Sequence, residues 1–152
     1  MERKLVCLHT NNIKTMNPTA DLIKIKSELL LKNIDIQTIS ENEVLSLLNN
    51  ELPEMQVEIK KISNKVSIYN VISCFADFTR QLANVGDLKE VKHCFNVAEK
   101  IWTSGNNTVK NAIENSYLFS LSSLLDLNCK IKDMLNAPLK REYNRQVFGS
   151  GI

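Results

Sequence analysis

The sequence predicts an all-α fold, either an up-and-down helical bundle or a short stack of helical hairpins. The 152 residues include only 4 Gly and 3 Pro, whereas a β-rich fold needs many tight turns, which these residues supply. Between Tyr69 and Leu125 most large apolar residues recur at steps of three and four, the spacing of one helix face. Helix-start patterns at Ser40 and Asp87 agree with this periodicity.

Composition limits the classes of partner. A hydrophobic fraction of 43% in 152 residues indicates one globular domain with a real core. The formal net charge of +2 predicts no nucleic-acid partner. No apolar run reaches the ~18–20 residues of a membrane span, and the start lacks the long apolar segment of a secretory signal. We therefore expect a cytoplasmic protein with no membrane partner, and the abundance of Asn, Lys and Ile suggests a bacterial source.

The N-terminal region is the least regular part of the sequence. Residues 1–17 show no periodicity and are expected to form an arm. A turn at Asn17-Pro18-Thr19 precedes a short amphipathic helix over roughly residues 20–32. Residues 34–39 alternate as a strand would, but residues 4–8 offer the only evident partner, so this segment is interpreted as an extended linker.

Ser40 begins the first strongly specified helix. Its hydroxyl can accept from the amide three residues on, and Glu43 can reach back to the amide of Ser40. The helix should end near Leu52-Pro53, because proline disfavours a helical residue before it. Helical spacing then continues over residues 54–85. A break at Ser63-Asn64, with Ser67 as another possible cap, could divide this stretch. The sequence therefore leaves open whether residues 54–85 form one helix or two.

The next two helices form a hairpin. Gly86 suits a helix C-terminus, where a left-handed residue is needed. Asp87 should cap the helix of residues 88–102, with Glu90 completing a second box. A turn over residues 105–108 leads into the helix of residues 109–125.

Shorter helices should follow around residues 131–135 and from Pro138 to about Val147, before a frayed tail at residues 149–152. Short connections make consecutive helices antiparallel neighbours within a single helical domain, residues 18–148. The predicted core consists of Tyr69, Ile72, Phe75, Val91, Phe95, Ala98, Trp102, Ile113, Tyr117 and Leu121.

The hairpin around Gly86 resembles one tetratricopeptide-type repeat. Val91 stands where that repeat usually has Ala, and Thr79 where it usually has Gly. No second copy follows at the 34-residue step, whereas a repeat array needs about three units. We interpret the likeness as shared hairpin packing. The matching positions are Gly86, Leu88, Val91, Phe95 and Ala98.

A second resemblance is carried by FADFT at residues 75–79, GDL at 86–88, VKHCF at 91–95, VKNAIEN at 109–115 and LKREY at 139–143. Through these stretches the chain from about residue 55 to residue 146 is similar to a small bacterial family of uncharacterised helical proteins. The resemblance implies an all-helical, stand-alone domain in a bacterium and no particular chemistry.

Residues suited to catalysis or metal binding are scarce. His93 and Cys94 are adjacent on a helix and point about 100° apart, so they cannot act as a catalytic dyad. His9 and His93 are the only histidines, and no Glu-x-x-His pair exists, so no metal site or cofactor is expected. The widely spaced cysteines are expected to be buried, reduced thiols.

Two classes of function fit this sequence. The favoured one is a non-enzymatic helical protein-interaction module, such as an adaptor, a regulator or an immunity-type protein. The alternative is an enzyme that processes a small molecule in a pocket between helices, lined by Asp77, Glu114 and Asn115. With Arg80, these residues stand beside apolar stripes and would otherwise form surface ion pairs.

For the favoured class, the partner site is predicted on the outer faces of the helices of residues 88–102 and 109–125. Tyr117 and Phe119 point in different directions, so one of them can serve as an exposed anchor, although Phe119 can instead pack on the N-terminal helices. The expected partner is a protein, and a homo-oligomer is left open. The predicted partner-binding residues are Lys89, Lys92, Glu99, Lys100 and Phe119.

Overall fold

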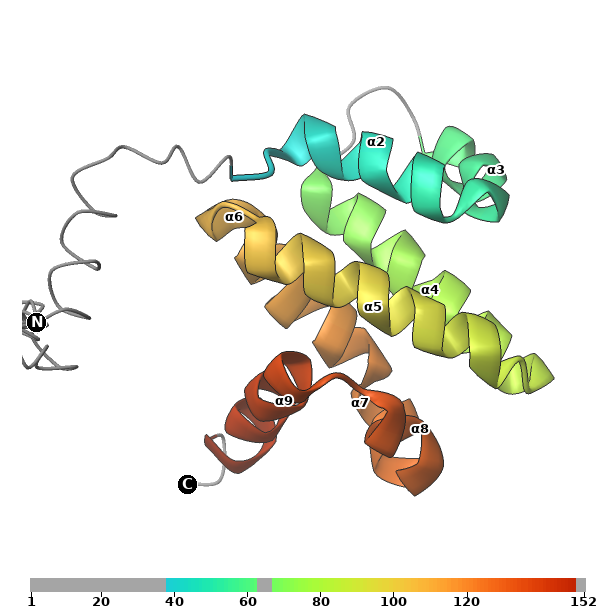
Figure 1. Ribbon diagram of the computed structural model, residues 1–152, viewed down its shortest axis with the longest axis vertical. Helices are drawn as coiled ribbons and strands as arrows, with labels where there is room; N and C mark the ends of the chain where they lie inside the picture. The colour runs from blue at the N-terminus through green and yellow to red at the C-terminus, as the bar shows by residue number, and fades with distance from the viewer. Residues whose placement is uncertain (1–37, 63–66, 150–152) are drawn as a thin grey trace, which may run out of the picture. The chain divides into compact units, whose positions relative to one another are not determined.

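The computed structural model describes residues 38–62 and 67–149, which belong to one compact unit over residues 37–152. These residues form helices joined by short connections, and among them there is no β-strand beyond an isolated bridge (Figure 1). The predicted all-α class is confirmed. The expected arm, the helix at residues 20–32 and the last residues of the tail lie outside the described ranges.

The first described helix begins where the capping pattern predicts. In α2 (Glu41–Glu51) the Glu43 carboxylate accepts from the backbone N–H and the hydroxyl of Ser40, both at 2.7 Å. These hydrogen bonds lower the pKa of Glu43. The helix ends before the 3-10 turn η1 (Pro53–Met55), which leads into α3 (Gln56–Lys61).

Residues 54–85 form more than one helix. A new helix, α4 (Ile68–Val85), starts after Ser67, whose side chain accepts from the backbone N–H of Tyr69 at 3.3 Å. Gly86 has φ 80° and ends α4 in the left-handed conformation. The Asp87 carboxylate then accepts from the backbone N–H of Glu90 at 3.2 Å and begins α5 (Leu88–Ser104).

The next stretch departs from the expected plain helix. It consists of α6 (Asn107–Ala112), the π-helical segment η2 (Ile113–Leu118) and α7 (Phe119–Leu127). The Asn106 side chain caps its start by accepting from the N–H of Val109 at 2.9 Å. Two more helices, α8 (Cys129–Met134) and α9 (Ala137–Gly149), complete the described chain.

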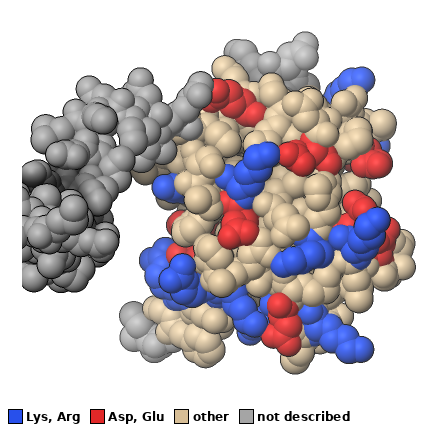
Figure 2. Space-filling model, viewed as in Figure 1, with Lys and Arg blue, Asp and Glu red and all other residues tan. Residues whose placement is uncertain are grey.

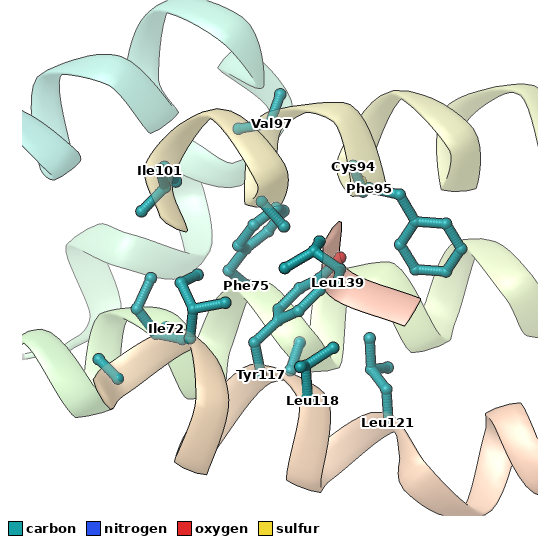
Figure 3. Packing of buried hydrophobic residues seen from close by; sticks show 14 of the residues in the cluster. Ile72, Phe75, Cys94, Phe95, Val97, Ile101, Tyr117, Leu118, Leu121 and Leu139 are labelled. Carbon is teal, nitrogen blue, oxygen red and sulfur yellow. The ribbon is translucent and has the colours of Figure 1, made fainter. Parts of the chain in front are cut away.

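The helices pack around α4, which contacts α5, η2 and α7. Figure 1 shows α4 and α5 side by side, with α2 and α3 above this pair and α8 and α9 below it. In the core the rings of Phe75 and Tyr117 stack with centroids 4.7 Å apart (Figure 3). The Thr79 hydroxyl, itself buried, lies 3.1 Å from the Tyr117 hydroxyl and donates to the Phe75 carbonyl at 2.9 Å.

The predicted core is confirmed except at two positions. Tyr69 is 39% exposed, because the buried stripe of α4 runs through Ile68, Val71 and Ile72, and Tyr69 turns away from it. Trp102 is only half-buried, and its indole N–H donates to the Glu114 carboxylate at 2.9 Å. The remaining predicted core residues are fully buried.

The extended segment before α2 has a partner that the sequence did not reveal. The N–H of Ile39 donates to the Ser104 carbonyl at 2.7 Å, and the Ile39 carbonyl accepts from Asn106 at 3.1 Å. Gly105 sits between these bonds, where a Cβ would lie 2.5 Å from Val109 Cγ1. Ile39, in the described part of the predicted extended segment, therefore pairs with the α5–α6 turn, and a side chain at residue 105 would displace its neighbours.

Candidate functional site

Two of the charged residues predicted to bind a partner hold the α8–α9 connection onto α5. The Lys92 ammonium donates to the Met134 carbonyl at 2.7 Å and to the Asn136 side-chain carbonyl. The Asn136 amide in turn donates to Glu99 and, at 3.1 Å, to Asn96. Lys92 and Glu99 are therefore engaged within the fold.

Lys100 joins α5 to α2 in the same way. Its ammonium lies 2.8 Å from the Glu51 carboxylate, and this ion pair lowers the pKa of Glu51. Two turns earlier on α5, His93 forms a 3.0 Å hydrogen bond between Nε2 and the Glu51 carbonyl. Lys89 is exposed and has no ion pair among the described residues. The polar face of α5 thus mainly fastens neighbouring helices.

The polar residues of the enzyme alternative do not share one cleft. Asp77 forms an exposed ion pair with Arg80 at 2.7 Å, and Arg80 also donates to the Ser120 carbonyl at 2.5 Å. Glu114 instead accepts from Trp102, while Asn115 is exposed. A 410 Å³ cleft beside α4 includes Asp77 without either of the other two, and its lining is Glu58, Lys61, Ile62, Asn70, Ser73, Cys74, Asp77, Phe78 and Gln81.

Cys74 and Cys94, two of the cysteines in the described ranges, are not activated as nucleophiles. Burial, followed by the charges of Glu58 and Asp77, raises the pKa of Cys74, which lines that cleft. Burial also raises the pKa of Cys94 to about 11, so both groups are protonated at neutral pH. Cys129 is exposed, contrary to the expectation of buried thiols. Within residues 38–62 and 67–149 no group of three or more His, Cys, Asp or Glu could hold a metal ion.

Phe119 lies in a different setting from the α5 residues. It is 72% exposed and borders a groove of 260 Å³ between the η2–α7 segment and α9. On α9, Val147 is 40% and Phe148 75% exposed. The α7–α9 groove, as this site is called below, is lined by Leu118, Phe119, Ser122, Asp126, Tyr143, Gln146 and Val147.

The π-helical turn and two polar contacts build this groove. Tyr117 and Leu118 are both fully buried at the end of η2, and the next residue, Phe119, faces solvent. Gln146 on α9 donates to the Glu114 carbonyl of η2 at 3.3 Å. The Tyr143 hydroxyl donates to the Asp126 carboxylate, and burial and this carboxylate raise the pKa of Tyr143 to about 12. Single π-helical turns often occur at functional sites.

The sequence singles out Phe119 as a partner-binding residue but gives no prediction for the α9 side of this groove. Val147 and Phe148 are adjacent on a helix, so they cannot both face the core. In α9, which is otherwise mostly polar, that pair is a detectable signal of an exposed apolar end. The groove depends on contacts between Tyr143, Asp126 and Gln146 that are distant in sequence, and periodicity within one helix does not report them.

The fold and the groove together define an all-helical domain with an aromatic surface site. Residues 45–149 match the model of a family described as a domain of unknown function, DUF7674, and the chain belongs to this family. The match extends from α2 to the end of α9 and includes both walls of the groove. No curated protein and no solved structure gives a significant match to the chain. In the described part of the chain no helix has the length and apolar character needed to cross a membrane.

Proposed function

We propose that this chain is a non-enzymatic protein-interaction module that binds a protein partner through the α7–α9 groove. The observation that carries the proposal is the exposure of Phe119 and Val147, which line one concave site from its two sides. Clustered exposed apolar residues mark interaction surfaces far more often than isolated ones do. An adaptor, a regulator or an immunity-type protein of a bacterial cytoplasm has such a role.

The groove has the composition of an interaction site. A Phe side chain buries roughly 150–250 Å² when fully covered, and Phe119 has 72% of its surface left to cover. At about 25 cal/mol per Å², covering it would contribute on the order of 3–4 kcal/mol, the scale of an interface hot spot. Ser122, Asp126 and Gln146 supply polar groups around this anchor.

The enzyme alternative has less support. Its three residues lie apart, with Asp77 in one cleft, Glu114 bonded to Trp102, and Asn115 exposed. General acid–base work requires such groups to converge on one reacting position. The polar residues of α5 likewise have structural roles, so the proposed partner surface centres on Phe119, with the α5 face as its rival.

The proposal is tested by capturing the partner from the organism that encodes the chain and then measuring its affinity. Phe119→Ser should weaken binding by at least about tenfold, because it removes the anchor. Val85→Ser is the matched control, since Val85 is 78% exposed at the tip of the α4–α5 hairpin, outside the groove. Circular dichroism and thermal melting check that both variants fold. Equal affinity of both variants and the original chain would contradict the proposal.

A further inference from the structure

The outer face of α7 is almost free of charge. From Asn115 to Leu127 the sequence has thirteen residues, and the single charged side chain among them is Asp126. In contrast, α5 carries Lys and Glu along its solvent side. Figure 2 shows Lys and Arg interspersed with Asp and Glu over the part of this face where Figure 1 places α5. Charged residues are depleted at the centres of protein interfaces, so the composition of α7 favours an interface.

Two large apolar side chains stand at the ends of this face. Phe119 is 72% exposed, and Leu127 is 89% exposed, the highest value for a large hydrophobic residue in the described part of the chain. Ser123 lies midway, four residues from each, and is also exposed. Steps of four keep side chains on one helix face, so Phe119, Ser123 and Leu127 form a stripe about 12 Å long, called the α7 stripe below. Leu127 is not part of the groove lining, so the α7–α9 groove does not account for its exposure.

The α7 stripe has the same pattern, large–small–large, in both directions. A two-fold symmetric contact requires such a pattern, because a residue on the axis meets its own copy and every other residue meets a different one. When two α7 helices pack antiparallel with Ser123 on the axis, Phe119 of each copy lies against Leu127 of the other. The small serine side chain lets the two helices approach closely, along the four-residue ridges by which helices commonly pack.

The charges near the α7 stripe do not oppose this contact. The Asp126 carboxylate accepts from the Tyr143 hydroxyl, and the Lys132 ammonium lies 5.0 Å from the centre of the same ring, so opposite charges stand together there. Arg141 and Arg145 lie on the opposite side of α9 from Tyr143. Like charges facing each other across an interface are unfavourable. A second copy therefore meets a face as neutral as its own, whereas a strongly charged partner finds no complementary cluster.

We propose that the chain forms a two-fold dimer through the α7 stripe, with the two α7 helices antiparallel and Ser123 on the axis. This inference rests on the proposed function, because Phe119 is the anchor in both, and it names a second copy of the chain as the partner. The second copy then covers the side of the α7–α9 groove that Phe119 forms. A contact this short is smaller than a standard interface, so the dissociation constant should be about 10–100 µM.

Sedimentation velocity on the full chain, over a range of about 5–500 µM, tests the dimer. The original chain should pass from monomer to dimer within this range. Leu127→Ser should weaken dimerisation at least about tenfold, because symmetry removes the side chain from both Phe119–Leu127 contacts. Val85→Ser is the matched control, since Val85 is 78% exposed and lies outside the α7 stripe, and it should change the dissociation constant less than about twofold. Circular dichroism checks that both variants fold.

Opposite charges at residue 123 test the symmetry itself. Ser123→Asp and Ser123→Lys should each be monomeric alone, because like charges would meet on the axis. An equimolar mixture of the two variants should restore the dimer, and added salt should weaken the mixed dimer. The control pair Val85→Asp and Val85→Lys should each dimerise like the original chain. A mixture of the residue 123 variants that stays monomeric would overturn the antiparallel arrangement.

The other outcomes separate this inference from the proposed function. A chain that is monomeric at every concentration, or equal effects of Leu127→Ser and Val85→Ser, would overturn the dimer. Phe119-dependent capture of a different protein by a monomeric chain would do the same and leave the groove as an interaction site. Self-association that both Phe119→Ser and Leu127→Ser leave intact would place the contact on another face and overturn the inference. If Phe119→Ser changed neither self-association nor capture of any protein, the proposed function would fail as well.

Discussion

The same substitution, Phe to Ala, should destabilise this fold strongly at one position and only slightly at another. Phe95 on α5 is 0% exposed, whereas Phe119 on α7 is 72% exposed. Truncating a fully buried Phe typically lowers the free energy of unfolding by about 3–5 kcal/mol, through lost transfer energy and the cavity left behind. Phe119→Ala removes little buried surface and favours the helix slightly, so it should cost less than about 1 kcal/mol.

Urea denaturation followed by circular dichroism measures both values. With a slope of about 1.5 kcal/mol/M for a domain of this size, Phe95→Ala should lower the midpoint by roughly 2–3 M. Phe119→Ala should leave it within about 0.5 M. Equal shifts for the two variants would show that the assignment of inner and outer helix faces is wrong. The small expected effect of Phe119→Ala also makes it suitable for binding experiments.

The remaining predictions concern the turns, ionisation and cross-links. Gly105→Ala should lower the free energy of unfolding by about 1–3 kcal/mol, because the added Cβ would lie 2.5 Å from Val109 Cγ1. Gly86→Ala should lower it by about 1–2 kcal/mol, because φ 80° is a left-handed conformation that disfavours a Cβ. Urea midpoints for either variant that match the original chain would refute these turn assignments. Stability should fall as pH rises above about 9, because burial raises the pKa of Cys94 to about 11 and that of Tyr117 well above its usual value, so unfolding releases protons. Tyr117→Phe should flatten that loss above about pH 10 in a series of urea titrations, and an unchanged profile would contradict the assignment. Neither EDTA nor a reducing agent should change the melting temperature, since the described residues contain no metal-ligand cluster and their cysteines are free thiols; a fall of many degrees would contradict this.

Local signals predicted most of the helical framework. The helix caps at Ser40 and Asp87 and the left-handed conformation of Gly86 depend only on residues a few positions away. The sequence alone therefore predicts where they occur. Core positions such as Phe75 and Phe95 follow from periodicity alone. Tyr69 was misplaced because the break before Ser67 reset the phase of the buried stripe.

The candidate site was less predictable because it depends on contacts between distant segments. The π-helical turn at residues 113–118 shifts the helix phase, and its apolar pattern resembles that of an ordinary helix. The sequence allowed Phe119 either to be exposed or to pack on the N-terminal helices. Its neighbours on α9 are set by packing of Tyr143 and Gln146, and the α5 charges found partners on α2 and the α8–α9 connection.

Site-specific photo-crosslinking in living cells tests the central claim most directly. The photoreactive analogue p-benzoylphenylalanine is introduced at Phe119 or Val147, which line the groove, and at Val85 or Val57 as exposed controls elsewhere. The account predicts that one protein partner is crosslinked from residues 119 and 147 and not from residues 85 and 57. Crosslinks to that partner from the control positions, with none from residue 119, would contradict it.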